Sequence, residues 1–75
     1  MVTLLFFGEL KDLAVPTAGI DFNGTVGQLR MHIEEVYPNI KNKTFSVAVN
    51  KIMASDDTMI TAGVEVAIMP PFSGG

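Results

Sequence analysis

Apolar residues follow two patterns along this chain, and each pattern predicts its own kind of element. Residues 2–7 are almost entirely apolar, form a run too short for a typical helix and end at Gly8, so they predict a central strand buried on both faces. Residues 17–22 alternate less regularly and predict a second, weaker strand. The connection between them predicts a helical turn at residues 9–13, and Asn23-Gly24 predicts a turn after the second strand.

The most regular pattern follows this turn and predicts the main helix. Thr25 stands three residues before Gln28, the spacing of a capping box, in which each side chain satisfies a backbone N–H group of the other residue. Pro38 ends the helix at or before the preceding residue, because a residue before proline avoids the α conformation. Between these limits one face of the helix carries the apolar residues Val26, Leu29, Ile33, Val36 and Tyr37.

The second half of the chain predicts two longer strands. They are residues 45–49 and residues 64–69, and the second leads directly into two prolines. The features between them are a turn at Asn50-Lys51, a short returning arm at Ile52-Met53, a break at residues 56–58 and a turn at Ala62-Gly63.

The order of these elements is β-β-α-β-(β)-β, with a single helix long enough to cover one face of a sheet. Two hairpin arms flanking one crossover helix predict an α+β domain of the ubiquitin-like β-grasp class, a mixed sheet with one main helix packed on one face. In that arrangement the first and last strands pair in parallel at the centre, which accounts for their apolar sequences. We expect the domain to span residues 1–69 and an extended tail to occupy residues 70–75.

Composition narrows the classes of function. A chain of 75 residues makes one small domain, and 48% hydrophobic residues argue against intrinsic disorder. The net charge of −3 and the scattered basic residues argue against nucleic-acid binding. We expect no membrane partner and a cytoplasmic location, because no long apolar run or signal peptide is present. The absence of cysteine excludes disulfides, zinc–thiolate sites and a thiol nucleophile, and with a single histidine no metal site is expected.

The end of the sequence combines stiffness with small size. Pro70 and Pro71 fix φ and favour an extended path, so residues 70–75 can stand off a globular body by up to about 20 Å. Gly74 and Gly75 lack Cβ and can enter a slot too narrow for other residues. This geometry suits a protein whose own C-terminal carboxylate, on Gly75, is the reacting group. The alternatives are a cloning scar or frayed end for the glycines, and a simple stop to an edge strand for the prolines.

Three stretches resemble the family of small, sulfur-carrier subunits of molybdopterin synthase: LLFFGELKDL at residues 4–13, VAVNK at 47–51 and GVEVAIMPPFSGG at 63–75. The resemblance covers nearly the whole chain in order and spacing. Its most specific part is Pro-Pro-x-x-Gly-Gly after a Glu-Val-Ala strand, since Gly-Gly alone is shared with ubiquitin-like modifiers and the sulfur carrier of the thiamine pathway. Val64 stands where members commonly carry an acidic residue, a difference that concerns a partner contact and leaves the chemistry of the tail untouched.

The resemblance implies a carrier that donates sulfur through Gly75. An E1-like adenylating enzyme would use ATP and Mg to activate the carboxylate, and a sulfur-donating enzyme would convert it to a thiocarboxylate. That sulfur would pass to a pterin precursor to form the dithiolene of molybdopterin. The catalytic groups would lie on a large catalytic subunit, in a heterotetramer, so this chain binds no cofactor itself. The open alternatives are a modifier conjugated to lysines, a carrier for thiamine synthesis or tRNA thiolation, and an interaction module whose tail simply docks.

The resemblance also implies which residues meet a partner. Phe6 and Phe7 must point to opposite faces of their strand, so one is core and the other, by resemblance Phe7, faces either a partner or the chain's own loops. Lys11 is either an interface residue or a solvated lysine. Met69 is either adaptable contact surface or core, as are Met53 and Met59, with core the default reading for each. The residues expected to insert into the partner are Pro70, Pro71, Phe72, Ser73 and Gly74, with Phe72 as an apolar anchor.

Overall fold

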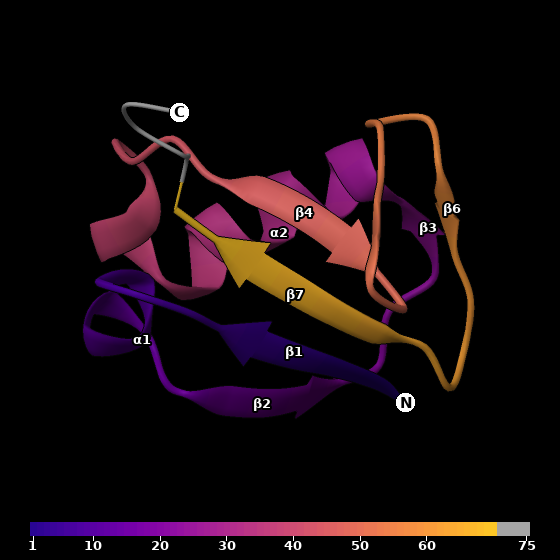
Figure 1. The fold of residues 1–75 in the computed structure, drawn as a ribbon, viewed down its shortest axis with the longest axis horizontal. Coiled ribbons are helices and arrows are strands. Elements are labelled where there is room, and N and C mark those ends of the chain that lie inside the picture. The colour runs from indigo at the N-terminus through magenta and orange to yellow at the C-terminus, as the bar shows by residue number, and fades with distance from the viewer. Residues whose placement is uncertain (71–75) are drawn as a thin grey trace.

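A computed structural model describes residues 1–70 of the chain; the predictions for Pro71, Phe72, Ser73, Gly74 and Gly75 lie outside the described residues. Most of the expected elements form, with ends shifted by one or two residues (Figure 1). In chain order they are β1 (Val2–Phe6), α1 (Leu10–Leu13), β2 (Thr17–Ile20), β3 (Gly24–Thr25), α2 (Val26–Val36), the 3₁₀ helix η1 (Pro38–Ile40), β4 (Ser46–Val49), β5 (Ile52–Met53), β6 (Met59–Ile60) and β7 (Glu65–Met69).

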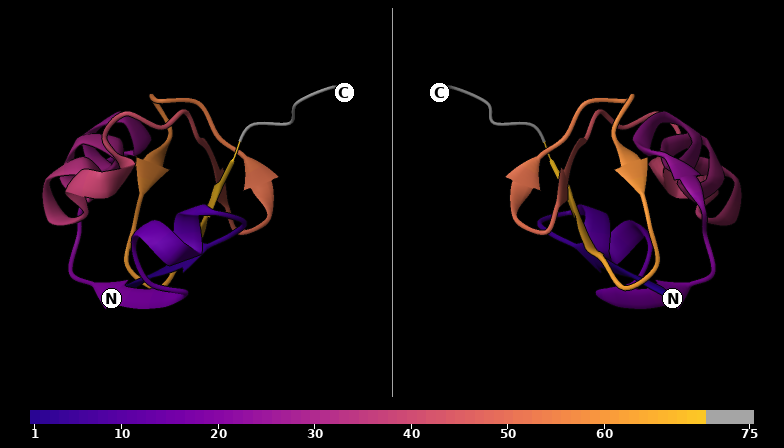
Figure 2. Two further views of the ribbon diagram at one scale, coloured as in Figure 1. Left: turned by 90° about the vertical axis from the view of Figure 1, so that its left-hand side faces the viewer. Right: turned by 90° about the vertical axis from the view of Figure 1, so that its right-hand side faces the viewer.

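Five strands form a mixed sheet in the order β2-β1-β7-β4-β5. Strands β1 and β7 pair in parallel inside the sheet, with Leu4 opposite Val66, and the other pairs are antiparallel. Helix α2 crosses one side of this sheet, so the domain has two layers (Figure 2). The predicted mixed sheet with one main helix on one face, and its parallel pair of first and last strands, is therefore confirmed.

Helix α2 starts where its capping box predicts. The Gln28 N–H donates to Thr25 Oγ1 at 3.2 Å, and the Thr25 N–H donates to Gln28 Oε1 at 2.9 Å. The helix ends at Val36, whose side chain is 50% exposed although the pattern placed it on the apolar face. The reason is that η1 follows at once and brings Ile40, fully buried, into the core at that end of the helix.

Replacing the capping threonine tests this account of the helix start. We expect Thr25→Ala to lower the free energy of unfolding by about 1 kcal/mol, because a backbone N–H loses its side-chain acceptor. Thr61→Ala is the control, since Thr61 is exposed outside any helix or strand. Urea denaturation measures both values. Equal losses for the two variants would show that the capping box contributes nothing specific.

The core lies between α2 and one face of the sheet. The prediction that the first strand is buried on both faces is therefore wrong. Along β1 and β7, fully buried positions alternate with half-buried or exposed ones. None of the elements within residues 1–70 packs on the second face, which leaves it open (Figure 2). The core residues are Val2, Leu4, Phe6, Leu10, Val26, Leu29, Ile33, Ile40, Phe45, Val47, Ile60, Val66 and Ile68.

A second correction concerns the segment before α2. The turn predicted at Asn23-Gly24 does not form; instead Gly24 pairs with Ile60 in the small β3–β6 ladder. The loop before β6 also binds the start of the helix: the Val26 N–H donates to the Thr58 carbonyl at 2.9 Å, and the Gly27 N–H donates to the Asp56 carbonyl at 3.0 Å. This ladder joins segments far apart in sequence, so the local dipeptide signal could not predict it.

Candidate functional site

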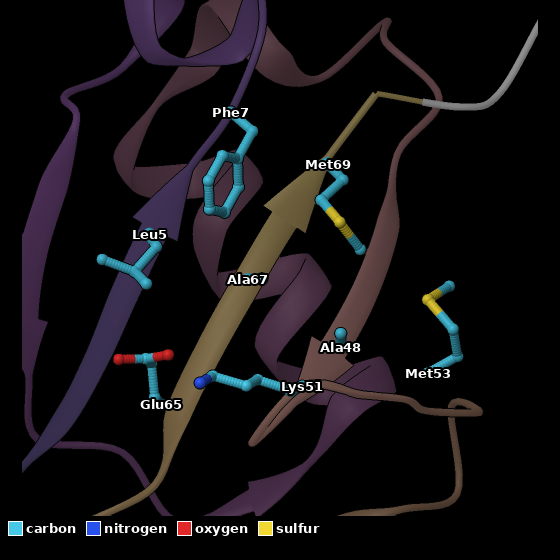
Figure 3. A pocket seen from close by; sticks show the side chains of 8 residues that line it. All are labelled: Leu5, Phe7, Ala48, Lys51, Met53, Glu65, Ala67 and Met69. Atoms are coloured by element: carbon cyan, nitrogen blue, oxygen red, sulfur yellow. The ribbon is translucent and has the colours of Figure 1, made fainter.

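The open face of the sheet carries an apolar groove of about 440 Å³ (Figure 3). Its floor follows from strand register, because residues opposite one another in a sheet project to the same face. Ala67 of β7 lies opposite Leu5 of β1 on one side and Ala48 of β4 on the other, and Ala48 lies opposite Met53 of β5. The groove is lined by Leu5, Phe7, Ala48, Lys51, Met53, Glu65, Ala67 and Met69.

Side-chain size gives the groove its shape. The two alanines, Ala48 and Ala67, keep its floor low, while larger side chains rise beside them (Figure 3). Phe7 is 46% exposed and Met53 57% exposed, whereas Phe6 is only 3% exposed on the core side. The prediction that the two phenylalanines face opposite ways is confirmed, and Phe7 is not covered by the loops within residues 1–70. Large exposed apolar side chains gathered in one groove mark a surface for binding another molecule.

One end of the groove is charged. Asn50 and Lys51 form the predicted turn with φ of 49° and 72°, which is the backbone of a tight hairpin turn. The turn is held to β7 by two bonds: the Asn50 N–H donates to the Glu65 carbonyl at 2.7 Å, and the Glu65 N–H donates to Asn50 Oδ1 at 2.9 Å. Lys51 and Glu65 consequently lie at the same end of the groove (Figure 3). A partner is thus offered an apolar surface with one ammonium and one carboxylate at its edge.

The opposite end of the groove leads to the predicted tail. Phe7 and Met69 line the groove there, and Met69 is the last residue of β7. Pro70 follows directly, and because it has no N–H it cannot continue the hydrogen-bond ladder. The sequence motif and the groove are therefore adjacent in the structure. Any protein that covers this groove is placed next to the start of residues 70–75.

The predicted interface residues fall into two groups. Phe7 and Met69 come together in the groove, while Lys11 lies exposed on α1 outside the groove lining and remains a prediction. The default assignment of Met53 and Met59 to the core is wrong, since each is 57% exposed, and only Met53 lines the groove. Sequence reasoning missed the other lining residues, Leu5, Ala48, Lys51, Glu65 and Ala67. The signal that could have found those on β1 and β7 is alternation from Phe7 and Met69 along each strand.

The rest of the described molecule offers little reactive chemistry. Within residues 1–70, no group of three or more histidine, cysteine, aspartate or glutamate side chains could hold a metal ion. His32 of α2 lies half-buried, with its ring centroid 5.9 Å from that of Phe22. No helix in the described part of the chain is long and apolar enough to cross a membrane.

The fold and the open groove define a ubiquitin-like β-grasp protein with an uncovered sheet face. Solved structures agree with this class. A putative molybdopterin converting factor, subunit 1 from Pyrococcus furiosus has a TM-score of 0.88 at 23% identity, covering 95% of this chain and 97% of that chain. The complex of subunits 1 and 2 of molybdopterin-converting factor from Helicobacter pylori contains a chain with a TM-score of 0.72 at 22% identity, covering 99% of this chain and 97% of that chain.

The chain belongs to the ThiS family, whose model matches residues 4–75. It is 31% identical over 80 residues to the molybdopterin synthase sulfur carrier subunit of Mycobacterium tuberculosis, covering 99% of this chain and 96% of that protein. It is 33% identical over 82 residues to the protein of the same name from Escherichia coli, covering both completely. The family resemblance predicted from the sequence is thereby confirmed.

Proposed function

We propose that this chain is the sulfur carrier subunit of a molybdopterin synthase. Two relatives with that name match it over nearly their full lengths. The observation that carries the proposal is the position of the groove, whose apolar end reaches Met69 immediately before the Pro-Pro-x-x-Gly-Gly tail. A carrier needs this combination, because a partner must hold the body firmly and take up the tail at the same time.

The proposed reacting group is the carboxylate of Gly75. A carboxylate is a poor electrophile, since its charge repels nucleophiles and oxide is a poor leaving group. In the proposed sequence one carboxylate oxygen attacks the α-phosphorus of ATP, with Mg²⁺ on the phosphates, and pyrophosphate leaves. A persulfide sulfur on a donor enzyme then displaces AMP, and a thiol attacks the resulting acyl disulfide, so that a disulfide forms and the thiocarboxylate is released. The chain has no cysteine on which sulfur could be carried instead.

The proposed partner of the groove is the large catalytic subunit. The Helicobacter pylori structure is a complex of subunits 1 and 2 of molybdopterin-converting factor, and one of its chains shares this fold. Phe7, at 46% exposure, is the type of aromatic side chain that contributes most to binding when it enters a partner's pocket. Lys51 and Glu65 at the charged end would set the orientation of docking, because rim charges act mainly on specificity and association rate.

Docking through the groove would serve to deliver the tail. Once the body is held, the thiocarboxylate meets its target at high effective concentration rather than by diffusion. The two consecutive prolines lower the entropy lost when the tail is ordered, since their φ angles are already fixed. The pterin-binding pocket and the acid–base groups belong, in this proposal, to the large subunit.

Reconstitution tests the proposed function. Thiocarboxylated chain, the large subunit encoded in the same genome and the pterin precursor are mixed, and dithiolene product is measured together with the mass of the spent carrier. We expect product to form and the carrier to return to the carboxylate form. The carboxylate form of the chain is the control and should yield nothing. If the thiocarboxylated chain also yields nothing, the proposal is wrong.

Three alternative functions are compatible with the same C-terminal sequence: a protein modifier, a carrier for another pathway and an interaction module. The named relatives do not favour any of them. Immunoblots of cells expressing the chain separate the modifier from the carrier. A ladder of larger conjugates is expected only from a modifier, because an isopeptide bond joins the chain permanently to its targets.

Two methionines with equal exposure test whether the groove is the docking surface. Met53 and Met59 are each 57% exposed, but only Met53 lines the groove. We expect Met53→Asp to weaken binding of the large subunit about tenfold, because it places a carboxylate in an apolar contact. Met59→Asp should leave the dissociation constant unchanged in isothermal titration calorimetry. Equal weakening by both variants would place the docking surface elsewhere.

A further inference from the structure

Gly8 lies in the turn after β1 and contacts Pro70 from the other end of the described chain. A Cβ atom added to Gly8 would stand 2.7 Å from Pro70 Cγ and 3.4 Å from Pro70 Cδ. Real Cβ atoms essentially never come within 3.0 Å of a heavy atom from a residue that is not a chain neighbour, so no side chain fits at position 8 while the Pro70 ring keeps its place. Gly8 also has a φ of 60°, which other residues rarely adopt.

The turn that contains Gly8 is firmly held. The Phe7 N–H donates to the Ile68 carbonyl at 3.0 Å, which fixes the end of β1 on β7. On the other side of Gly8, the Lys11 N–H donates to the Gly8 carbonyl at 3.4 Å, and Leu10 is fully buried. Because Phe7 before it and Leu10 after it are anchored, Gly8 cannot easily move away from Pro70.

Pro70, in contrast, is not held by strand pairing. The regular pairing of β7 ends with Met69, which lies opposite Ser46, and Pro70 has no N–H with which to extend it. The position of the Pro70 ring therefore depends on the chain geometry at Met69 and on side-chain packing. The ring packs on Gly8.

We propose that Gly8 is a positioning residue whose bare Cα holds the Pro70 ring and so sets the orientation of the chain at the point where residues 71–75 begin. The inference rests on the proposed function, because this orientation matters only if those residues must reach a site on a docked partner. Residues 71–75 can span up to about 17 Å, so a tilt of about 10° at Pro70 displaces the end by about 3 Å. Misplacement of a reacting group by about 1 Å can lower a rate about 100-fold.

Gly63 offers a matched control. Its φ is 89°, so alanine there introduces the same kind of backbone strain, but no atom lies within 4 Å of the added Cβ. Gly8→Ala and Gly63→Ala should therefore shift the urea midpoint by similar amounts. Only Gly8→Ala should slow single-turnover sulfur transfer to the large subunit, by about 10-fold to 100-fold.

Removing the Pro70 ring should suppress the slowing of sulfur transfer that Gly8→Ala causes. In Pro70→Ala the Cγ and Cδ atoms that obstruct a Cβ at position 8 are gone. The factor by which Gly8→Ala slows transfer should then fall to about twofold or less, which a double-mutant cycle measures. An unchanged factor in the Pro70→Ala background, or equal slowing by Gly63→Ala, would overturn the proposal.

Nuclear magnetic resonance of the free protein tests the contact without any sulfur chemistry. We expect NOEs between the Gly8 Hα atoms and the Pro70 ring in the wild type and in Gly63→Ala. Gly8→Ala should weaken the corresponding NOEs and shift the amide signals of residues 72–75. Absent NOEs in the wild type, or unshifted amides in Gly8→Ala, would overturn the inference. Failure of wild-type sulfur transfer would instead contradict the proposed function, and the NOEs would still decide whether Gly8 positions Pro70.

Discussion

Deleting Gly75 is expected to lower sulfur transfer to the pterin precursor by at least about 100-fold while leaving the affinity for the large subunit nearly unchanged. The deletion moves the terminal carboxylate back by one residue, or up to about 3.5 Å, which is far outside the tolerance of a reacting group. The proposed docking groove is untouched, because it is lined by Phe7 and by residues of β1, β4, β5, β7 and the turn after β4. Single-turnover product formation and calorimetric affinity together separate the two effects.

A chain with one extra glycine after Gly75 is the companion variant. It keeps the Gly-Gly chemistry but moves the carboxylate forward, so a similar loss of transfer is expected if placement is what matters. Transfer that survives both changes would contradict a reacting group at Gly75. Loss of affinity in parallel with transfer would show that the tail, rather than the groove, provides most of the binding.

Replacing the centre of the groove floor should strongly weaken docking without unfolding the domain. Ala67 is half-buried on the open face between Leu5 and Ala48. An aspartate there would place a carboxylate without a partner in an apolar contact, a change that typically costs about 2–5 kcal/mol of binding free energy. We expect Ala67→Asp to weaken binding of the large subunit about 30-fold or more, and calorimetry measures it.

Ala62→Asp introduces the same side chain at an exposed position in the turn before β7, outside the groove lining, and should bind normally. The free energy of unfolding of Ala67→Asp should fall by about 1 kcal/mol, the span of strand preferences, because its side chain leaves the core untouched. Normal binding by Ala67→Asp would remove the groove from the proposed function. Loss of binding by both variants would point to a general charge effect.

Local signals in the sequence were sufficient for most of the fold. The Thr25–Gln28 spacing located the start of α2, and Pro38 located its end to within one residue. The β-grasp arrangement inferred from the order of the elements predicted that the first and last strands pair in parallel, and the register of Leu4 and Val66 confirms it. In each case the prediction needed only the sequence of single elements and the order in which they follow one another.

Features that depend on distant segments escaped prediction. The β3–β6 ladder pairs Gly24 with Ile60, so the Asn23-Gly24 signal for a turn was outweighed by a contact far along the chain. Val36 matched the helical period but lies beyond the point where Ile40 fills the core. Periodicity states which residues share a face, not where that face stops being covered.

Only part of the candidate site could be predicted from the sequence, for a related reason. Continuous apolar sequence in a strand is typical of burial on both faces, and here the second face is left open instead. Composition cannot separate these two cases, because both require apolar side chains. The tail motif pointed to the end of β7, but the turn that carries Lys51 is held at the site by the bonds between Asn50 and Glu65.

The central claim is that the carboxylate of Gly75 carries the sulfur, and intact mass spectrometry tests it most directly. The chain is incubated with its adenylating enzyme, ATP, Mg²⁺ and a sulfur source. We predict a mass gain equal to the difference between a sulfur and an oxygen atom, located at Gly75 by fragmentation and absent without ATP. No gain with the cognate enzymes, or a gain located on any other residue, would contradict the account.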